Sequence, residues 1–95
     1  MIITQDGLNI TARFFKAIEL LRDNKKLRGL QTFTRAHNLN YWNIMSIRNE
    51  PDKHSLRPEY ILWLSRDYNV SLEWLFYGTG FFYSKDEYGN DKASV

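Results

Sequence analysis

The spacing of four residues near the middle of the chain constrains the fold more than any other feature. Phe33 is followed at once by the small residue Thr34, then by Asn38 and, six positions further on, by Ile44. Two short helices that pack across a tight turn need four residue types at such intervals. These are an apolar residue in the first helix, a small residue where the helices cross, a residue that forms the turn, and an apolar residue that packs the second helix against the core. The spacing therefore predicts a helix-turn-helix.

The residues around this turn also predict where its two helices begin and end. The first helix is expected over residues 30–37, because asparagine tolerates a left-handed backbone and Asn38 can therefore end it. The second is expected over residues 41–49, with the Asn40 side chain capping its start by accepting hydrogen bonds from backbone N–H groups. Its inward-facing residues would be Ile44 and Ile47.

A further helix is predicted before this pair, over residues 11–24. Its apolar residues recur at the intervals of one helix face, and these are Phe14, Ile18 and Leu21. Asn9 or Thr11 is expected to cap its start, since both side chains can accept from a free backbone N–H.

Two more helices are predicted after the pair. Pro58 suits a first helical position and begins a segment that reaches residue 68. Ser71 is expected to cap a short helix over residues 72–77, which Gly78 ends. The five segments together predict an all-α five-helix bundle.

Composition indicates one domain and a short tail. The 95 residues, 43% of them hydrophobic and 16% aromatic, suffice for one packed core, which we assign to residues 9–83. Residues 84–95 are polar and are expected to form a flexible C-terminal tail. No stretch has the pattern of a signal peptide or a membrane span, so the expected location is the cytoplasm.

Charge is unevenly distributed along the chain. Residues 9–57 contain ten basic and four acidic side chains, a net charge of +6, whereas the rest of the chain carries −4. A polyanion would be attracted to the first part and repelled by the second, which favours one orientation of a nucleic acid.

Catalytic and metal-binding patterns are missing from the sequence. There is no cysteine, and His37 and His54 belong to no metal-ligand spacing. Gly78 and Gly80 follow a short helix and precede aromatic residues, which is typical of a turn and not of a phosphate-binding loop. We expect no enzymatic activity, no metal, no cofactor, no membrane association and no small-molecule substrate.

With these residues the chain resembles the lambda-repressor and Cro-like family of helix-turn-helix regulators, the xenobiotic-response-element type, including short forms from phages and mobile elements. The resemblance spans residues 14–82 and has a second signature, a helix carrying Trp74 and Leu75 followed by Gly78 and Gly80. It implies a lambda-repressor-like DNA-binding domain, and a transcriptional repressor whose third helix reads the DNA.

The helix over residues 41–49 is the expected reading element, because an α-helix fits the major groove of double-stranded DNA. With Ile44 and Ile47 inward, its open face would carry the base-reading residues. These are Asn40, Tyr41, Trp42, Asn43, Met45, Ser46, Arg48 and Asn49. Asn43 suits adenine, Arg48 suits guanine or a phosphate, and Trp42 either touches a thymine methyl or packs against neighbouring helices.

Polar and basic residues around this helix are expected to contact the phosphate backbone. They are Lys25, Lys26, Arg28, Gln31, Thr32, Lys53 and His54. Each of them alone is equally well explained as an exposed solubilising residue.

Two questions stay open at the level of sequence. The aromatic segment from Trp74 to Tyr83 either forms a homodimer interface, as a palindromic DNA site would require, or simply covers the base of the bundle. The bundle either binds DNA or serves as an interaction module that binds a partner protein.

Overall fold

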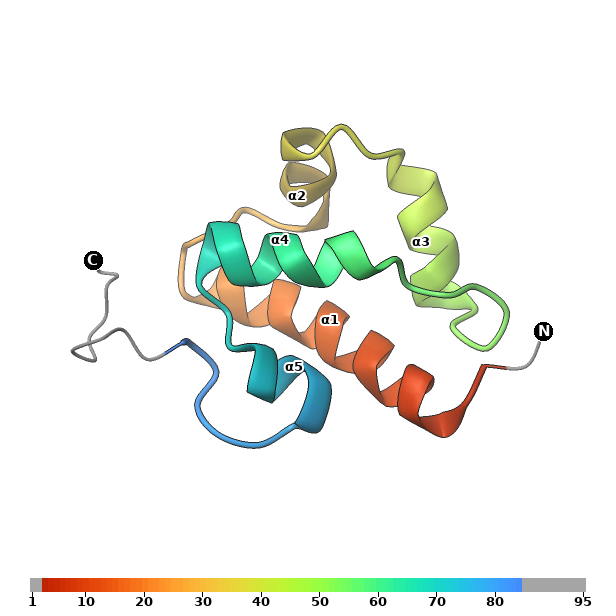
Figure 1. The fold of residues 1–95 in the computed structure, drawn as a ribbon. Helices are drawn as coiled ribbons and strands as arrows, with labels where there is room; N and C mark the ends of the chain where they lie inside the picture. Colours follow the sequence, from red (N-terminus) through yellow and green to blue (C-terminus); the bar gives the residue numbers. More distant parts are fainter. Residues whose placement is uncertain (1–2, 85–95) are drawn as a thin grey trace. The chain divides into compact units, whose positions relative to one another are not determined.

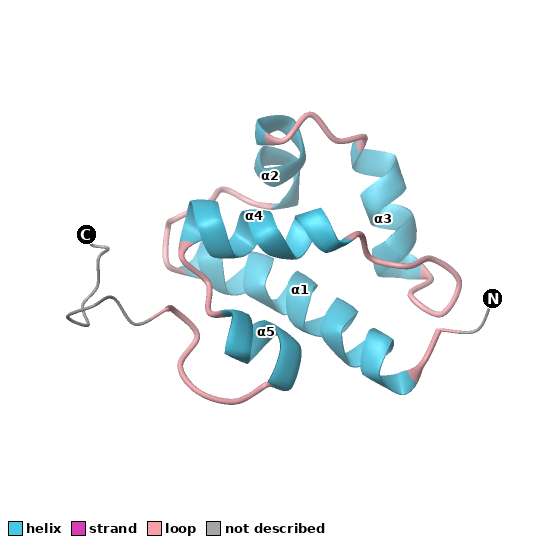
Figure 2. Cartoon of the chain, viewed as in Figure 1, coloured by secondary structure: helices cyan, strands magenta, loops and turns pink. Residues whose placement is uncertain are grey.

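The computed structural model describes residues 3–84, and within this range the protein is all-α (Figures 1 and 2). The helices are α1 (Gln5–Asp23), α2 (Leu30–Ala36), α3 (Tyr41–Asn49), α4 (Pro58–Tyr68) and α5 (Leu72–Tyr77). No β-strand occurs among the described residues, which contain one isolated bridge, between Val70 and Tyr83. The chain divides after Leu56 into two compact units.

The first unit, α1 to α3, is built on the apolar faces that the sequence predicts. Phe14 on α1 is fully buried and meets the ring of Phe33 on α2 edge to face, with 5.6 Å between centroids. From α3, Ile44 and Ile47 are buried, and α3 contacts both α1 and α2. The predicted inward face of α3 is thus confirmed, and the opposite face of the helix carries exposed side chains.

The turn between α2 and α3 has the predicted geometry. Asn38 adopts a left-handed conformation with φ 57°, and the backbone N–H of Leu39 donates to the Thr34 carbonyl oxygen at 2.8 Å. Thr34 is buried, and its hydroxyl donates to the Gln31 carbonyl oxygen, which satisfies the polar group inside the unit. Helix α2 ends one residue earlier than expected, with His37 as its C-cap.

Helix α1 begins six residues earlier than the sequence predicts. Its N-cap is Thr4, whose hydroxyl accepts a hydrogen bond from the Gly7 N–H at 3.1 Å. The expected cap at Asn9 or Thr11 is wrong, because Thr11 lies inside the helix and is buried.

The second unit contains α4 and α5, with the bounds that the sequence predicts. Ser71 caps α5 by accepting from the Trp74 N–H, and Gly78 ends it in a left-handed conformation. The bridge between Val70 and Tyr83 then closes the chain around α5. Ser84, which the sequence assigns to the tail, donates its backbone N–H to the Asn69 carbonyl oxygen at 2.8 Å, whereas residues 85–95 of that expected tail lie outside the described range.

Candidate nucleic-acid interface

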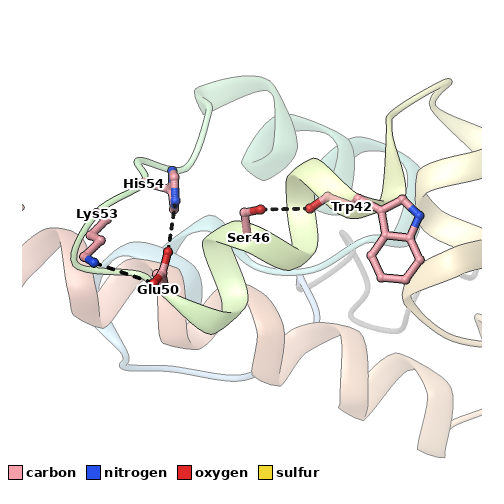
Figure 3. Close-up of polar contacts among 5 residues, drawn as sticks. All are labelled: Trp42, Ser46, Glu50, Lys53 and His54. Carbon is pink, nitrogen blue, oxygen red and sulfur yellow. Dashed lines mark hydrogen bonds and ion pairs between the residues drawn. The ribbon is translucent and has the colours of Figure 1, made fainter.

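Helix α3 has an open polar face opposite its buried isoleucines. Trp42, Ser46 and Asn49 follow one another at intervals of one helical turn, Asn43 lies beside them, and all four side chains are exposed. We call these four residues the α3 stripe. The Ser46 hydroxyl donates to the Trp42 carbonyl oxygen along this stripe (Figure 3).

The indole of Trp42 is the most exposed large side chain of α3. It is 73% exposed, and its ring meets that of Tyr41 edge to face at 5.1 Å between centroids. Of the two alternatives that the sequence left for Trp42, packing in the core is therefore excluded. Tyr41 and Met45, which we expected on the open face, are only half exposed and flank it.

Asn40 holds the first turn of α3 in place. Its side-chain oxygen accepts hydrogen bonds from the backbone N–H groups of Trp42 at 2.8 Å and of Asn43 at 3.1 Å. The predicted cap is confirmed, and it fixes the backbone of the two residues that begin the stripe.

Four arginines border a cleft of about 510 Å³ beside α3. They come from the end of α1, the α1–α2 loop, α2 and α3, and they are Arg22, Arg28, Arg35 and Arg48. Tyr41 of α3 and Gln31 of α2 also line this hollow, which we call the arginine cleft.

A second hollow of about 600 Å³ adjoins the arginine cleft, since the two share Arg22, Arg28 and Thr32. Lys25 and Lys26 also line it. The next residue of their loop, Leu27, is buried and packs in the core. We call this second hollow the lysine hollow. Four of the expected phosphate contacts thus lie together here, and a fifth, Gln31, lies in the neighbouring cleft.

Lys53 and His54 line neither hollow. Both are held by Glu50, whose carboxylate lies 3.6 Å from Lys53 Nζ and 3.5 Å from His54 Nε2 (Figure 3). The carboxylate offsets the positive charge of Lys53, so this ammonium attracts an anion less than the lysines of the hollow do.

Arg22 and Arg35 are the site residues for which sequence reasoning assigned no contact. Neither belongs to a motif, and both lie on exposed helix surface, where a basic side chain is ordinary. Only the packing of α1, α2 and α3 brings their guanidinium groups to one cleft.

The second unit carries a separate set of exposed rings. Tyr77 is 78% and Phe81 77% exposed, whereas Trp74 and Phe82 are half buried and pack edge to face at 4.8 Å between centroids. The aromatic segment is therefore divided between an inward pair and exposed rings.

In the same unit, burial raises the pKa of Tyr60 above its ordinary value.

Within residues 3–84, no group of acidic residues and histidines is arranged to hold a metal ion. None of the helices in that range is long and apolar enough to cross a membrane. No protein-family model matches the chain, and comparisons with characterised proteins and with solved structures give no match either.

Proposed function

We propose that this protein is a sequence-specific, double-stranded DNA-binding regulator, a cytoplasmic repressor of the kind found in phages and mobile elements, in which α3 enters the major groove. The observation that carries the proposal is the α3 stripe, an exposed row of hydrogen-bonding and aromatic side chains on a helix whose other face is locked by Ile44 and Ile47. A helix of nine residues held in this way can present side chains to base edges without unfolding.

The charge around α3 supports the same interpretation. The lysine hollow and the arginine cleft gather cationic groups within one unit, and the cleft is lined in part by α3 itself. Phosphate contacts orient a protein on DNA and supply most of the non-specific attraction. In this proposal Lys25, Lys26 and Arg28 contact the backbone while Asn43 and Ser46 contact base edges.

The protein acts as a homodimer in this proposal, since one short helix reads too few base pairs for a unique site. The exposed rings of Tyr77 and Phe81 provide the apolar surface of the dimer. Two copies related by a two-fold axis would read half-sites about 34 Å apart.

Selection of bound duplexes from a random DNA pool tests the proposal directly. We expect enrichment of a two-fold symmetric sequence, and binding that weakens steeply as salt rises. Sedimentation measured in parallel gives the oligomeric state, and replacing both Tyr77 and Phe81 by serine should shift a dimer toward monomer. A selected pool that stays random, with no binding at low salt, would refute the proposal.

A protein-interaction module is the second candidate, favoured by the exposed indole of Trp42. Aromatic rings are enriched where proteins bind one another, and the Trp42 ring is 73% exposed. The two candidates differ in what the basic hollows do. A protein partner would be indicated if replacing Lys25 and Lys26 by glutamine leaves binding of the partner unchanged while Trp42→Ala abolishes that binding.

A further inference from the structure

We propose that the arginine cleft binds a small phosphorylated organic molecule of the nucleotide class. The cleft has its own volume within the first unit, distinct from the exposed α3 stripe. Its lining combines four arginines with the apolar side chains of Phe15, Ile18 and Leu30, which we call the apolar floor. A phosphorylated organic ligand needs both kinds of contact.

The electrostatic balance of the cleft favours an anion with more than one charge. Among the described residues, the lining contains four arginines and one carboxylate, that of Glu19, which lies 3.8 Å from the Lys16 ammonium. Arg22 is already paired with Asp23, which lies 3.8 Å away. Among residues 3–84, no ion pair involves Arg28, Arg35 or Arg48. Guanidinium groups bind phosphate oxygens through paired, charge-assisted hydrogen bonds, so these three arginines can hold a phosphate group without breaking an ion pair of the described residues.

The size and floor of the cleft favour an organic body on that phosphate. Its volume of about 510 Å³ lies within the range of small-molecule sites, roughly 300 to 1,000 Å³, and an inorganic phosphate would leave most of it unfilled. Phe15, Ile18 and Leu30 contribute apolar lining, and the Tyr41 ring is half exposed there. A planar heterocycle can pack on such a surface and stack on an arginine.

Occupancy of the cleft would also reach α3, because Tyr41 and Arg48 line the cleft from that helix. A bound nucleotide neutralises the Arg48 guanidinium and adds negative charge next to the DNA. DNA affinity would then fall on ligand binding, and by linkage DNA would weaken the ligand equally. This regulatory step rests on the proposed function, whereas the binding of the ligand does not.

Isothermal titration calorimetry of the whole chain with ADP, pyrophosphate and adenosine tests the site. We expect saturable one-to-one binding of ADP, weaker binding of pyrophosphate and none of adenosine. Replacing both Arg35 and Arg48 by glutamine should weaken ADP binding at least about tenfold, because two charge-assisted contacts are lost. Glu19→Gln should strengthen it, since this change removes the one carboxylate that residues 3–84 contribute to the lining.

The matched control replaces Arg57 and Arg66 by glutamine, which removes the same charge from exposed positions outside the cleft. Unchanged ADP binding in this control supports a local site, and equal weakening in both double variants would overturn it. ADP that binds no more tightly than pyrophosphate would overturn the role of the apolar floor.

Duplex DNA is the remaining titrant, and it separates the two sources of phosphate. If duplex DNA binding depends on Arg35 and Arg48 while ADP gives no heat, the cleft belongs to the DNA backbone and the nucleotide proposal fails. If ADP binds but no duplex does, the DNA-binding proposal fails and the nucleotide site stands. ADP that lowers duplex affinity supports the regulatory step, and duplex binding unaffected by saturating ADP contradicts it.

Discussion

The Ser46 hydroxyl donates a hydrogen bond to the carbonyl oxygen of Trp42, 3.0 Å away and one turn earlier in α3. The two side chains therefore share one face of the helix, and both are exposed. Substitutions on this face remove no core packing, which allows DNA binding to be separated from stability.

Replacing Asn43 by alanine and Ser46 by glutamate in one variant should abolish DNA binding. The first change removes the proposed base contact, for which about 1 to 3 kcal/mol of discrimination is expected, and the second places a negative charge where the proposal puts the DNA. Electrophoretic mobility shift with the selected duplex measures the loss.

The melting temperature of this variant is its control. Both positions are exposed, so the melting temperature should stay within a few degrees of that of the wild type. A fall in melting temperature as large as that of a core variant would mean that the stripe has a structural role.

Ile44→Asp should unfold the first unit. Ile44 is fully buried between the helices of that unit, and an unpaired carboxylate there is costly. We expect destabilisation above about 4 kcal/mol, measured by circular dichroism during denaturation in urea. A folded Ile44→Asp variant would contradict the inward orientation of this residue.

Two substitutions of Asn40 should separate capping from charge. Asn40→Ala removes the acceptor for the Trp42 and Asn43 N–H groups and should cost about 1 kcal/mol of stability. Asn40→Asp keeps that acceptor and should preserve stability, but its charge should weaken DNA binding. Thermal denaturation and DNA titration of both variants check this, and equal DNA affinities for the two would rule out the effect of charge.

The salt dependence of DNA binding should distinguish the lysines of the hollow, Lys25 and Lys26, from Lys53, which is paired with Glu50. Replacing Lys25 and Lys26 by glutamine should reduce the slope of log affinity against log salt by roughly 0.9 for each lost phosphate contact. Lys53→Gln should change it less, because Glu50 already offsets this charge. Fluorescence anisotropy over a range of salt measures the slopes, and a larger effect of Lys53→Gln would reverse the assignment.

Local signals explain why most of the helix bounds were predictable. Asn40 and Ser71 cap helices through their own side chains, and Pro58 and Gly78 act through backbone restrictions, so each is readable from the residue itself. The start of α1 was missed because Thr4 caps a first turn that lies before the periodic apolar residues.

The surroundings of the site were less predictable for a different reason. Periodicity identifies which face of α3 is inward, but not how far the Trp42 ring extends into solvent. Arg22 and Arg35 occupy one cleft only after three helices have packed. Contacts between residues far apart in sequence leave no local trace of this kind.

If the protein binds DNA as proposed, the cap at Asn40 limits the hydrogen bonds that this residue can offer to a base. Its amide oxygen already receives two backbone N–H groups, so toward a bound duplex the side chain can offer its NH₂ group alone. Guanine O6 and N7, thymine O4 and adenine N7 accept such hydrogen bonds, whereas the two-way pairing of an asparagine with adenine N6 and N7 needs the oxygen as well. In the proposed complex, the first residue before α3 would therefore contact acceptor atoms of the bases, independent of the residues that follow.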